Sequence, residues 1–221
     1  MTSRQQSKSS FIHPSFYGPG KRIIDSVLAL LAICLLSPFI ILGWLLLYLQ
    51  HGLPIIFRQE RLGYKQQRFI LYKLRTMVNN AESLKKQNQN YYQQLNIAPQ
   101  PMFKIKDDPR FTKAGRGLSS AGLDELPQLI NVIRGDMALV GPRPLPSAEA
   151  LALKQIDPQW FEWRHQIKPG IFSVWTYSDQ RHHSLKSWKK LERQTLTLNL
   201  WQQYLLMIKV IVKQIKYAIQ L

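Results

Sequence analysis

The chain has 221 residues, of which 45% are hydrophobic, and carries 30 Lys and Arg against 13 Asp and Glu, a formal net charge of +17. This length fits one domain, or one domain with an anchor. The basic excess indicates an anionic partner, which leaves nucleic acid, an anionic membrane and phosphorylated substrates open. The only cysteine, Cys34, lies in an apolar run, so a disulfide, a zinc site and a cysteine nucleophile have no support.

Residues 1–20 are polar and contain Gly and Pro, and we predict a flexible N-terminal arm with some helix near residues 11–16. No motif of small residues follows the next apolar run, so we do not predict a signal peptide.

Residues 21–51 are predicted to form a membrane anchor. Positions 27–49 carry no charge, and about 20 apolar residues suffice for a straight helical span. Ser37-Pro38 interrupts the middle, where Pro removes a backbone hydrogen bond and a Ser hydroxyl can satisfy the freed carbonyl. Both flanks are basic, which places both ends in the cytoplasm. We therefore predict a re-entrant helix-break-helix, with an ordinary kinked span as the alternative.

Asp25 lies at the start of the apolar run, where a charge is costly unless it is paired. Lys21 or Arg22, within one helical turn, is the expected partner. We expect this pair to have a structural role.

Residues 52–221 are predicted to form the domain that follows the anchor, of α+β class and mostly helical. Short extended runs over 53–62 and 69–77 indicate a two-stranded unit with Gly63 in the turn. Residues 79–101 are rich in Asn, Gln and Lys and predict a solvent-facing helix and loop. Asp107-Asp108 is either a turn cap or a Mg²⁺ ligand pair. Residues 113–117 predict a flexible cationic loop.

The pair Asp124 and Glu125 precedes an apolar helical pattern that ends at Gly135. Asp124 is a good N-cap type, and the helix dipole there would stabilise a carboxylate and attract phosphate. Arg143 follows between two prolines, which form a stiff platform. Taken alone, however, the acid pair also fits an ordinary helix start.

Three later stretches also have recognisable sequence patterns. The aromatic run 160–164 predicts either core packing or an interfacial belt. Residues 174–177 are typical of a strand. Residues 187–221 predict one long basic amphipathic helix, which either lies in the membrane interface or packs on the domain.

Seven motifs in this order resemble the bacterial sugar transferase family, the small monotopic phosphoglycosyl transferases, over about residues 20 to 215. The motifs are Lys21-Arg22 with Asp25, the Ser37-Pro38 break, 57–63, 73–77, Asp108-Pro109-Arg110-Phe111-Thr112, 123–128, and Gly135-Asp136-Met137 through Gly141-Pro142-Arg143-Pro144.

The resemblance implies transfer of a sugar-1-phosphate from a UDP-sugar to a polyprenyl phosphate, usually undecaprenyl phosphate. UMP is the second product, and the lipid-linked sugar starts a surface glycan. It also implies Mg²⁺ and a covalent intermediate on Asp124, with Glu125 binding metal or moving protons. The location would be the cytoplasmic face of the bacterial inner membrane, with anionic lipids as partners and no nucleic acid.

A carboxylate can attack a diphosphate only after the diphosphate charge has been neutralised. Arg110 and Arg143 are the first candidates to bind phosphate. A second group of candidates consists of Arg58, Arg61, Lys73 and Arg75. The alternative for this group is that its members hold the acids in place or contact lipid headgroups.

Ser119 and Ser120 stand where the family commonly has a basic pair, which puts one phosphate contact in doubt. The C-terminal helix also lacks the family's usual Asp. An active enzyme is favoured over a weakened one because the acid pair and the Gly-Pro-Arg-Pro turn are intact. A membrane-tethered scaffold or nucleic-acid-binding protein, and a glycosyltransferase that releases UDP, are the rival functions. The sequence does not identify the sugar. It also does not determine the oligomeric state, which leaves a homodimer open.

Overall fold

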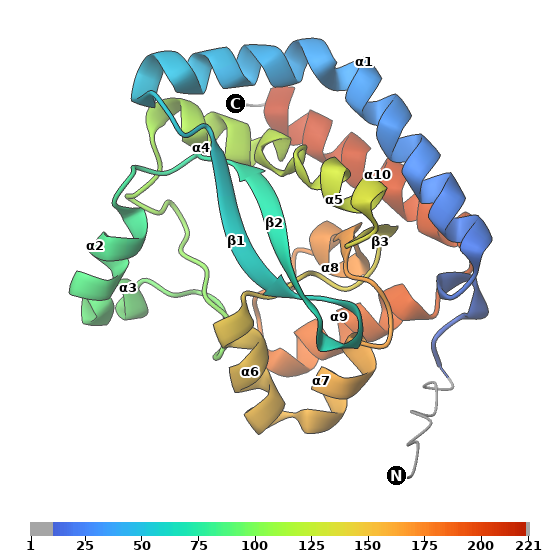
Figure 1. Cartoon of the computed structure of the whole chain (residues 1–221). Coiled ribbons are helices and arrows are strands. Elements are labelled where there is room, and N and C mark those ends of the chain that lie inside the picture. The colour runs from blue at the N-terminus through green and yellow to red at the C-terminus, as the bar shows by residue number, and fades with distance from the viewer. Residues whose placement is uncertain (1–10, 220–221) are drawn as a thin grey trace.

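The computed structural model describes residues 11–219 (Figure 1). The strands are β1 (Ile56–Leu62), β2 (Arg68–Leu74), β3 (Ala138–Val140) and β4 (Gly170–Phe172). The α-helices are α1 (Pro19–His51), α2 (Ala81–Gln87), α3 (Gln89–Gln94), α4 (Lys113–Ser120), α5 (Gln128–Arg134), α6 (Ser147–Ile156), α7 (Pro158–Arg164), α8 (Val174–Tyr177), α9 (Leu185–Leu196) and α10 (Leu200–Ile219). Three 3₁₀ turns are η1 (Pro14–Phe16), η2 (Tyr64–Gln66) and η3 (Leu123–Glu125).

Helix α1 runs for 33 residues, with Pro38 inside it. Pro38 donates no hydrogen bond to the carbonyl of Cys34, four residues earlier. The hydroxyl of Ser37 donates to that carbonyl instead, at 2.9 Å, which is the compensation predicted from the sequence. The structure therefore has one bent helix over this segment, rather than two helices separated by a break (Figure 1).

Both ends of α1 are attached to the same domain. Near its start, Asp25 accepts hydrogen bonds from Lys21 at 2.7 Å, from the Leu139 amide at 3.1 Å and from the Tyr204 hydroxyl at 3.0 Å. Lys21 is therefore the partner of Asp25, out of the two predicted candidates Lys21 and Arg22. Near the other end, Gln50 accepts a hydrogen bond from the Ala114 amide at 3.3 Å. The helix therefore curves over the domain, as Figure 1 shows.

The outward face of α1 is apolar and exposed. Its exposed side chains include Leu30, Leu31, Leu35, Phe39, Leu42, Leu45, Leu46 and Leu49. Because exposed leucine is costly in water, a face of this size marks a contact with another apolar phase. By length and composition α1 is able to cross a membrane, which is consistent with membrane association.

The predicted two-stranded unit is confirmed. Strands β1 and β2 pair antiparallel, with Ile56 opposite Leu74 and Leu62 opposite Arg68. On β2, Leu71 is buried in the core while Ile70 on the other face is largely exposed. Asn131 of α5 clamps the edge of β2, because its side chain donates to the Ile70 carbonyl and accepts from the Tyr72 amide.

Strands β3 and β4 pair in parallel, with Ala138 opposite Gly170. The strand predicted at 174–177 is wrong, since these residues form the short helix α8. The hydroxyl of Ser173 accepts a hydrogen bond from the Thr176 amide, which is an N-cap that starts a helix.

The flexible cationic loop predicted at 113–117 is also wrong. These residues begin α4, because the Thr112 hydroxyl accepts a hydrogen bond from the Gly115 amide and caps the helix. A side chain at Gly115 would collide with the Thr76 carbonyl, so the glycine here permits close packing.

The single C-terminal helix predicted over 187–221 is instead two helices, α9 and α10. The reason is a capping box: the Gln202 amide donates to the Asn199 side chain, and the Asn199 amide donates to the Gln202 side chain. This exchange satisfies both amides and begins a new helix in a new direction.

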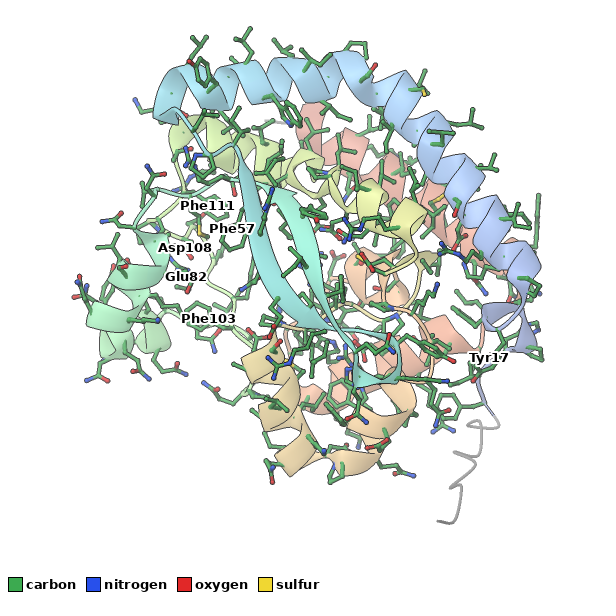
Figure 2. All side chains as sticks on the ribbon, in the orientation of Figure 1. Tyr17, Phe57, Glu82, Phe103, Asp108 and Phe111 are labelled. Atoms are coloured by element: carbon green, nitrogen blue, oxygen red, sulfur yellow. The ribbon has the colours of Figure 1, made fainter. Side chains whose placement is uncertain are left out.

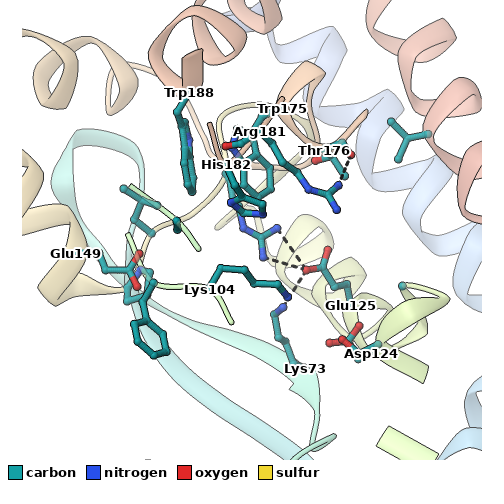
Figure 3. A pocket seen from close by; sticks show the side chains of 18 of the residues that line it. Lys73, Lys104, Asp124, Glu125, Glu149, Trp175, Thr176, Arg181, His182 and Trp188 are labelled. Carbon is teal, nitrogen blue, oxygen red and sulfur yellow. Dashed lines mark hydrogen bonds and ion pairs between the residues drawn. The ribbon is translucent and has the colours of Figure 1, made fainter. Parts of the chain in front are cut away.

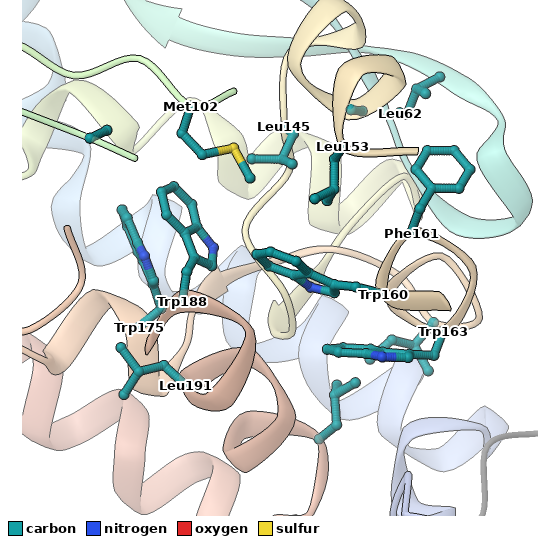
Figure 4. Packing of buried hydrophobic residues seen from close by; sticks show 14 of the residues in the cluster. Leu62, Met102, Leu145, Leu153, Trp160, Phe161, Trp163, Trp175, Trp188 and Leu191 are labelled. Atoms are coloured by element: carbon teal, nitrogen blue, oxygen red, sulfur yellow. The ribbon is translucent and has the colours of Figure 1, made fainter. Parts of the chain in front are cut away.

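The largest core cluster is aromatic and lies among α6, α7 and α9 (Figure 4). Trp160, Phe161 and Trp163 are each at most 5% exposed, so core packing is the correct alternative for the run 160–164. Ile12 joins this core, and the His13 amide donates to the Leu196 carbonyl. The described part of the N-terminal arm therefore packs on the domain. Residues 1–10 of that predicted arm lie outside the described residues.

Candidate active site

The acid pair lies in the 3₁₀ turn η3, just before α5. Gly122 precedes it at φ 72°, a left-handed conformation that suits glycine. Helix α5 begins at Gln128, and Asp124 makes no side-chain capping bond to it, so the predicted N-cap role is wrong. The predicted end of this helix is confirmed, since Gly135 is left-handed at φ 86°.

A cavity of about 300 Å³ opens beside the pair (Figure 3). Six Lys and Arg side chains line it against three acids, so its positive excess suits an anionic ligand. The cations are Arg61, Lys73, Lys104, Arg143, Arg181 and Lys213, and the acids are Asp124, Glu125 and Glu149.

Glu125 is held by two of these cations. Lys73 of β2 donates to its Oε1 at 2.9 Å, and Arg143 approaches the same oxygen at 3.4 Å. Burial opposes the ionisation of Glu125, but the charges of Lys73 and Arg143 outweigh it and hold the pKa of Glu125 well below its usual range. Glu125 is therefore ionised and fixed in place.

Asp124 has the opposite environment. It is 7% exposed, and its carboxylate has no hydrogen-bond or ion-pair partner among the residues that the structure describes. Burial raises its pKa, the charge of Lys73 partly offsets this, and the charge of Glu125 adds to it. A desolvated, unpartnered carboxylate next to a paired one is free to bond an incoming group.

The structure brings together only part of the predicted phosphate-binding set. Arg143, Lys73 and Arg61 line the cavity. Arg110 instead forms a two-point ion pair with Asp108, at 2.6 Å and 2.9 Å, and faces an adjoining cavity. Because its carboxylate is engaged by Arg110, Asp108 belongs to the turn, the first of the two predicted alternatives, and not to a metal site.

The remaining predicted cations lie farther out. Arg75 faces the adjoining cavity, and its guanidinium donates to the Gly52 carbonyl. Arg58 stacks over Tyr72 at 6.0 Å and lines neither cavity. Lys113 and Arg116 of α4 are exposed outside both cavities.

Sequence reasoning missed five ionisable groups that line the first cavity: Lys104, Glu149, Arg181, His182 and Lys213. Lys104 points toward the acid pair (Figure 3), and enclosure together with repulsion from Arg143 lowers its pKa. Lys104 and Arg181 supply cations in the cavity that Ser119 and Ser120 also line. Neither residue has a local signal in the sequence, because loops from distant segments bring them here.

The adjoining cavity has about 300 Å³ and shares Arg61, Lys73, Lys104 and Asp124 with the first. Figure 2 shows Phe57, Phe103 and Phe111 beside Glu82 between β1 and α2. The two cavities together form one cleft with the acid pair in its wall. Such a mixed polar and aromatic cleft fits a small molecule larger than phosphate.

A third cavity, which we call the apolar channel, lies between α1 and α10. It has about 360 Å³, and its lining includes Leu28, Ala32, Leu36, Leu126, Leu129, Met207, Ile211 and Ile215. Its inner end reaches Gly122 and Glu125, which also line the first cavity. Glu125 of the acid pair therefore lines both the charged cleft and the apolar channel beside the candidate membrane helix.

Residues 16–220 match the family described as bacterial sugar transferase. The chain belongs to the bacterial sugar transferase family. Together with the names of its relatives, this membership makes it a phosphoglycosyl transferase. The resemblance identified from seven motifs is thereby confirmed over nearly the whole chain.

Three relatives of this sugar transferase illustrate the match. It is 34% identical to the exopolysaccharide production protein ExoY of Sinorhizobium fredii, over 73% of this chain and 70% of that protein. It is 36% identical to the undecaprenyl-phosphate galactose phosphotransferase of Salmonella typhimurium, over 72% of this chain and 32% of that protein. It is 36% identical to the UDP-glucose:undecaprenyl-phosphate glucose-1-phosphate transferase of Caulobacter vibrioides, over 68% of this chain and 51% of that protein.

Proposed function

We propose that this sugar transferase moves a sugar-1-phosphate from a UDP-sugar to undecaprenyl phosphate and releases UMP, as the first membrane step of surface glycan assembly. The observation that carries the proposal is the acid pair. Glu125 is tied to Lys73 and Arg143, whereas the Asp124 carboxylate beside it has no partner among the described residues.

In the first half-reaction, an oxygen of Asp124 attacks the phosphorus that bears the sugar. An acyl-phosphate bond forms, the bond to the bridging oxygen breaks, and UMP leaves with that oxygen. In the second, a phosphate oxygen of the lipid attacks the same phosphorus, and the Asp124 carboxylate is released. Arg143, Lys73 and Lys104 surround this position and offset the negative charge of the reacting phosphates.

Mg²⁺ is the proposed cofactor, with Asp124 and Glu125 as its protein ligands. No group of three or more His, Cys, Asp or Glu suited to a metal occurs among the described residues. Two carboxylates are nevertheless enough, because Mg²⁺ usually takes one or two carboxylates and completes its shell with water and substrate phosphates. When bound, the ion supplies charge neutralisation of the diphosphate.

The apolar channel supports a polyprenyl acceptor. Its lining includes residues of α1, α5, β4 and α10, and also Glu125 beside the proposed nucleophile. An isoprenoid chain in this channel would leave its phosphate at the acid pair. Such a chain is confined to the bilayer, so the enzyme must meet it there.

A re-entrant path of α1 is the proposed membrane topology, on the cytoplasmic face of the inner membrane. Asp25 near one end and Gln50 near the other both bind the same domain. A helix that crossed the bilayer would separate its ends by about 30 Å of hydrocarbon. The exposed Lys209 and the basic excess of the chain favour anionic lipids as partners.

The function is tested by incubating purified protein with Mg²⁺, UDP-sugars and undecaprenyl phosphate and measuring UMP. We expect UMP from the wild type and at least a 1,000-fold slower release from Asp124→Asn, on the order of the loss seen when a nucleophile is removed. Release of UDP instead of UMP would indicate a glycosyltransferase that transfers the sugar without its phosphate. Equal rates for wild type and Asp124→Asn would rule out the aspartyl intermediate.

A further inference from the structure

A fully buried ion pair lies behind the active site, on α7 and α9. Glu192 is 0% exposed and Arg164 is 3% exposed. The Arg164 Nε and Nη2 donate to the two oxygens of Glu192 at 3.1 Å and 2.9 Å, and the Trp160 indole donates to Glu192 at 2.8 Å. Burying two charges carries a large desolvation cost, and apolar residues of similar size often stabilise a fold equally well. The pair therefore calls for another role.

The first connection from this pair to the active site is through the backbone. The Nη2 of Arg164 also donates to the carbonyl of Arg143 at 2.6 Å. This carbonyl lies in the Pro-Arg-Pro turn, whose prolines fix backbone dihedrals on either side but leave the Arg143 side chain free to rotate.

The second connection is through the side chain of Arg143. The Trp188 indole donates to Glu192 Oε1 at 3.2 Å, and the Trp188 ring packs on the Trp175 ring with centroids 4.5 Å apart. The Arg143 guanidinium lies over Trp175 at 5.0 Å. The same carboxylate thus supports both the backbone and the stacking surface of Arg143, whose other side faces Glu125.

We propose that Glu192 and Arg164 are positioning residues, which hold the Arg143 guanidinium beside the acid pair. The inference rests on the proposed function, in which that pair handles phosphate. A long arginine side chain loses considerable rotamer freedom when it is held in one geometry. The buried pair fixes this geometry before substrate binds, so the enzyme does not have to order Arg143 during turnover.

The test replaces the pair by Arg164→Met with Glu192→Met, which keeps apolar volume in the core and removes both charges together. Lys189→Met is the matched control, because Lys189 also links α9 to the start of α7, through Asp157 at 2.6 Å, without reaching Arg143. We expect both proteins to unfold cooperatively on heating. We expect UMP release at saturating UDP-sugar to fall at least 10-fold in the double variant and to stay within 2-fold of wild type in the control.

A cycle with Arg143→Ala identifies Arg143 as the residue through which the pair acts. We expect this substitution to slow the wild type by about 100-fold, as loss of one charge-stabilising donor does. In the Met/Met background it should cost less than about 5-fold, because Arg143 is already misplaced there. UDP affinity, measured by calorimetry on the same four proteins, should show the same non-additivity.

Additive effects in both measurements would overturn the positioning role, as would full activity in a folded Met/Met variant. Should the Met/Met variant not fold, the same cycle is run on Arg164→Lys, which keeps the charge opposite Glu192 but lacks the fork that reaches two acceptors. UDP affinity does not depend on the nucleophile. Persistent UMP release by Asp124→Asn would therefore overturn the proposed mechanism, while the calorimetric cycle would still decide the positioning role.

Discussion

Two adjacent acids in this enzyme differ because different neighbours face them. The Glu125 carboxylate meets Lys73 and Arg143, which favour its charged form, and burial at Asp124 favours the neutral form. The helix dipole that the sequence suggested is not needed for this division, since Asp124 does not cap α5. The charges of Lys73, Arg143 and Lys104 oppose the effect of burial on Asp124, which in the proposed reaction attacks phosphorus as the ionised carboxylate.

Glu149 in the same cleft provides a pH test. Burial raises its pKa to about 6, and Arg61 only partly offsets this. A pKa that is higher in the folded than in the unfolded protein does not destabilise the fold below pH 4.5, where the acid is protonated in both states. The cost develops as pH rises toward 6 and is then constant, at about 2 kcal/mol for a difference of this size.

We expect Glu149→Gln to unfold at a higher temperature than the wild type at pH 8, and at the same temperature at pH 4. Thermal unfolding in detergent at both pH values measures this difference. The control is Glu162→Gln at an exposed position, which should change the unfolding temperature equally at both pH values. A Glu149→Gln effect that is also equal at pH 4 and pH 8 would contradict the assigned environment.

At the scale of elements, the parallel pair β3–β4 fixes the turn that carries Arg143. The Gly170 amide donates to the Pro142 carbonyl at 2.9 Å, so β4 holds the start of the Pro-Arg-Pro turn. This contact depends on two glycines. A Cβ on Gly170 would lie 2.0 Å from the backbone nitrogen of Gly141, where only backbone movement could relieve it.

We expect Gly170→Ala to destabilise the protein by about 1–3 kcal/mol, the usual cost of overpacking, and to reduce activity through displacement of Arg143. Gly117→Ala is the control, because a Cβ there meets no atom within 4 Å and alanine favours helix α4. Thermal unfolding and UMP release measure the two effects. Equal stability of the two variants would show that the strands do not need this close approach.

The apolar channel is bounded on two sides by the helices α1 and α10. Ala32→Phe fills it from α1, whereas Leu31→Phe on the outward face, where Leu31 is 59% exposed, leaves it open. We expect Ala32→Phe to raise the KM for undecaprenyl phosphate at least 10-fold and to leave unchanged the single burst of UMP released without acceptor. Leu31→Phe should change neither. A slower burst in Ala32→Phe would indicate damage to the acid pair rather than a blocked channel.

On the scale of the whole molecule, one curved helix attaches an apolar outer surface to a basic catalytic domain. Helix α1 curves over the domain (Figure 1) and carries the exposed leucines. The charged cleft is lined by Lys73 of β2 and by the acid pair before α5 (Figure 3). In the proposed reaction, this arrangement would let one molecule meet a lipid acceptor and a water-soluble nucleotide at the same pair of acids.

The re-entrant path is tested in a Cys34→Ala background with single cysteines at Gly18→Cys and Lys86→Cys, two exposed positions on either side of α1. We expect a membrane-impermeant maleimide to label both in inverted vesicles and neither in right-side-out vesicles. Labelling of the two positions from opposite sides would show that α1 spans the bilayer.

The sequence alone determined the features that depend on neighbours along the chain. A charge-free run sets the length of α1, Ser37 compensates for Pro38 within one turn, Lys21 pairs with Asp25, and Gly135 ends α5. The family also followed from the sequence, because seven short motifs in order are specific even though each alone is weak. Helix caps also depend on neighbours along the chain, although our predictions did not include the caps at Thr112, Ser173 and Asn199.

Only the tertiary structure decided which of the many cations serve the acids. Lys73, Lys104 and Arg143 come from three separate segments, and Arg110, equally eligible by residue type, is held by Asp108 instead. The buried pair behind Arg143 joins α7 to α9 over 28 positions of sequence. Charges act through space and burial, so residue type and spacing along the chain do not report which cation faces which acid; packing does.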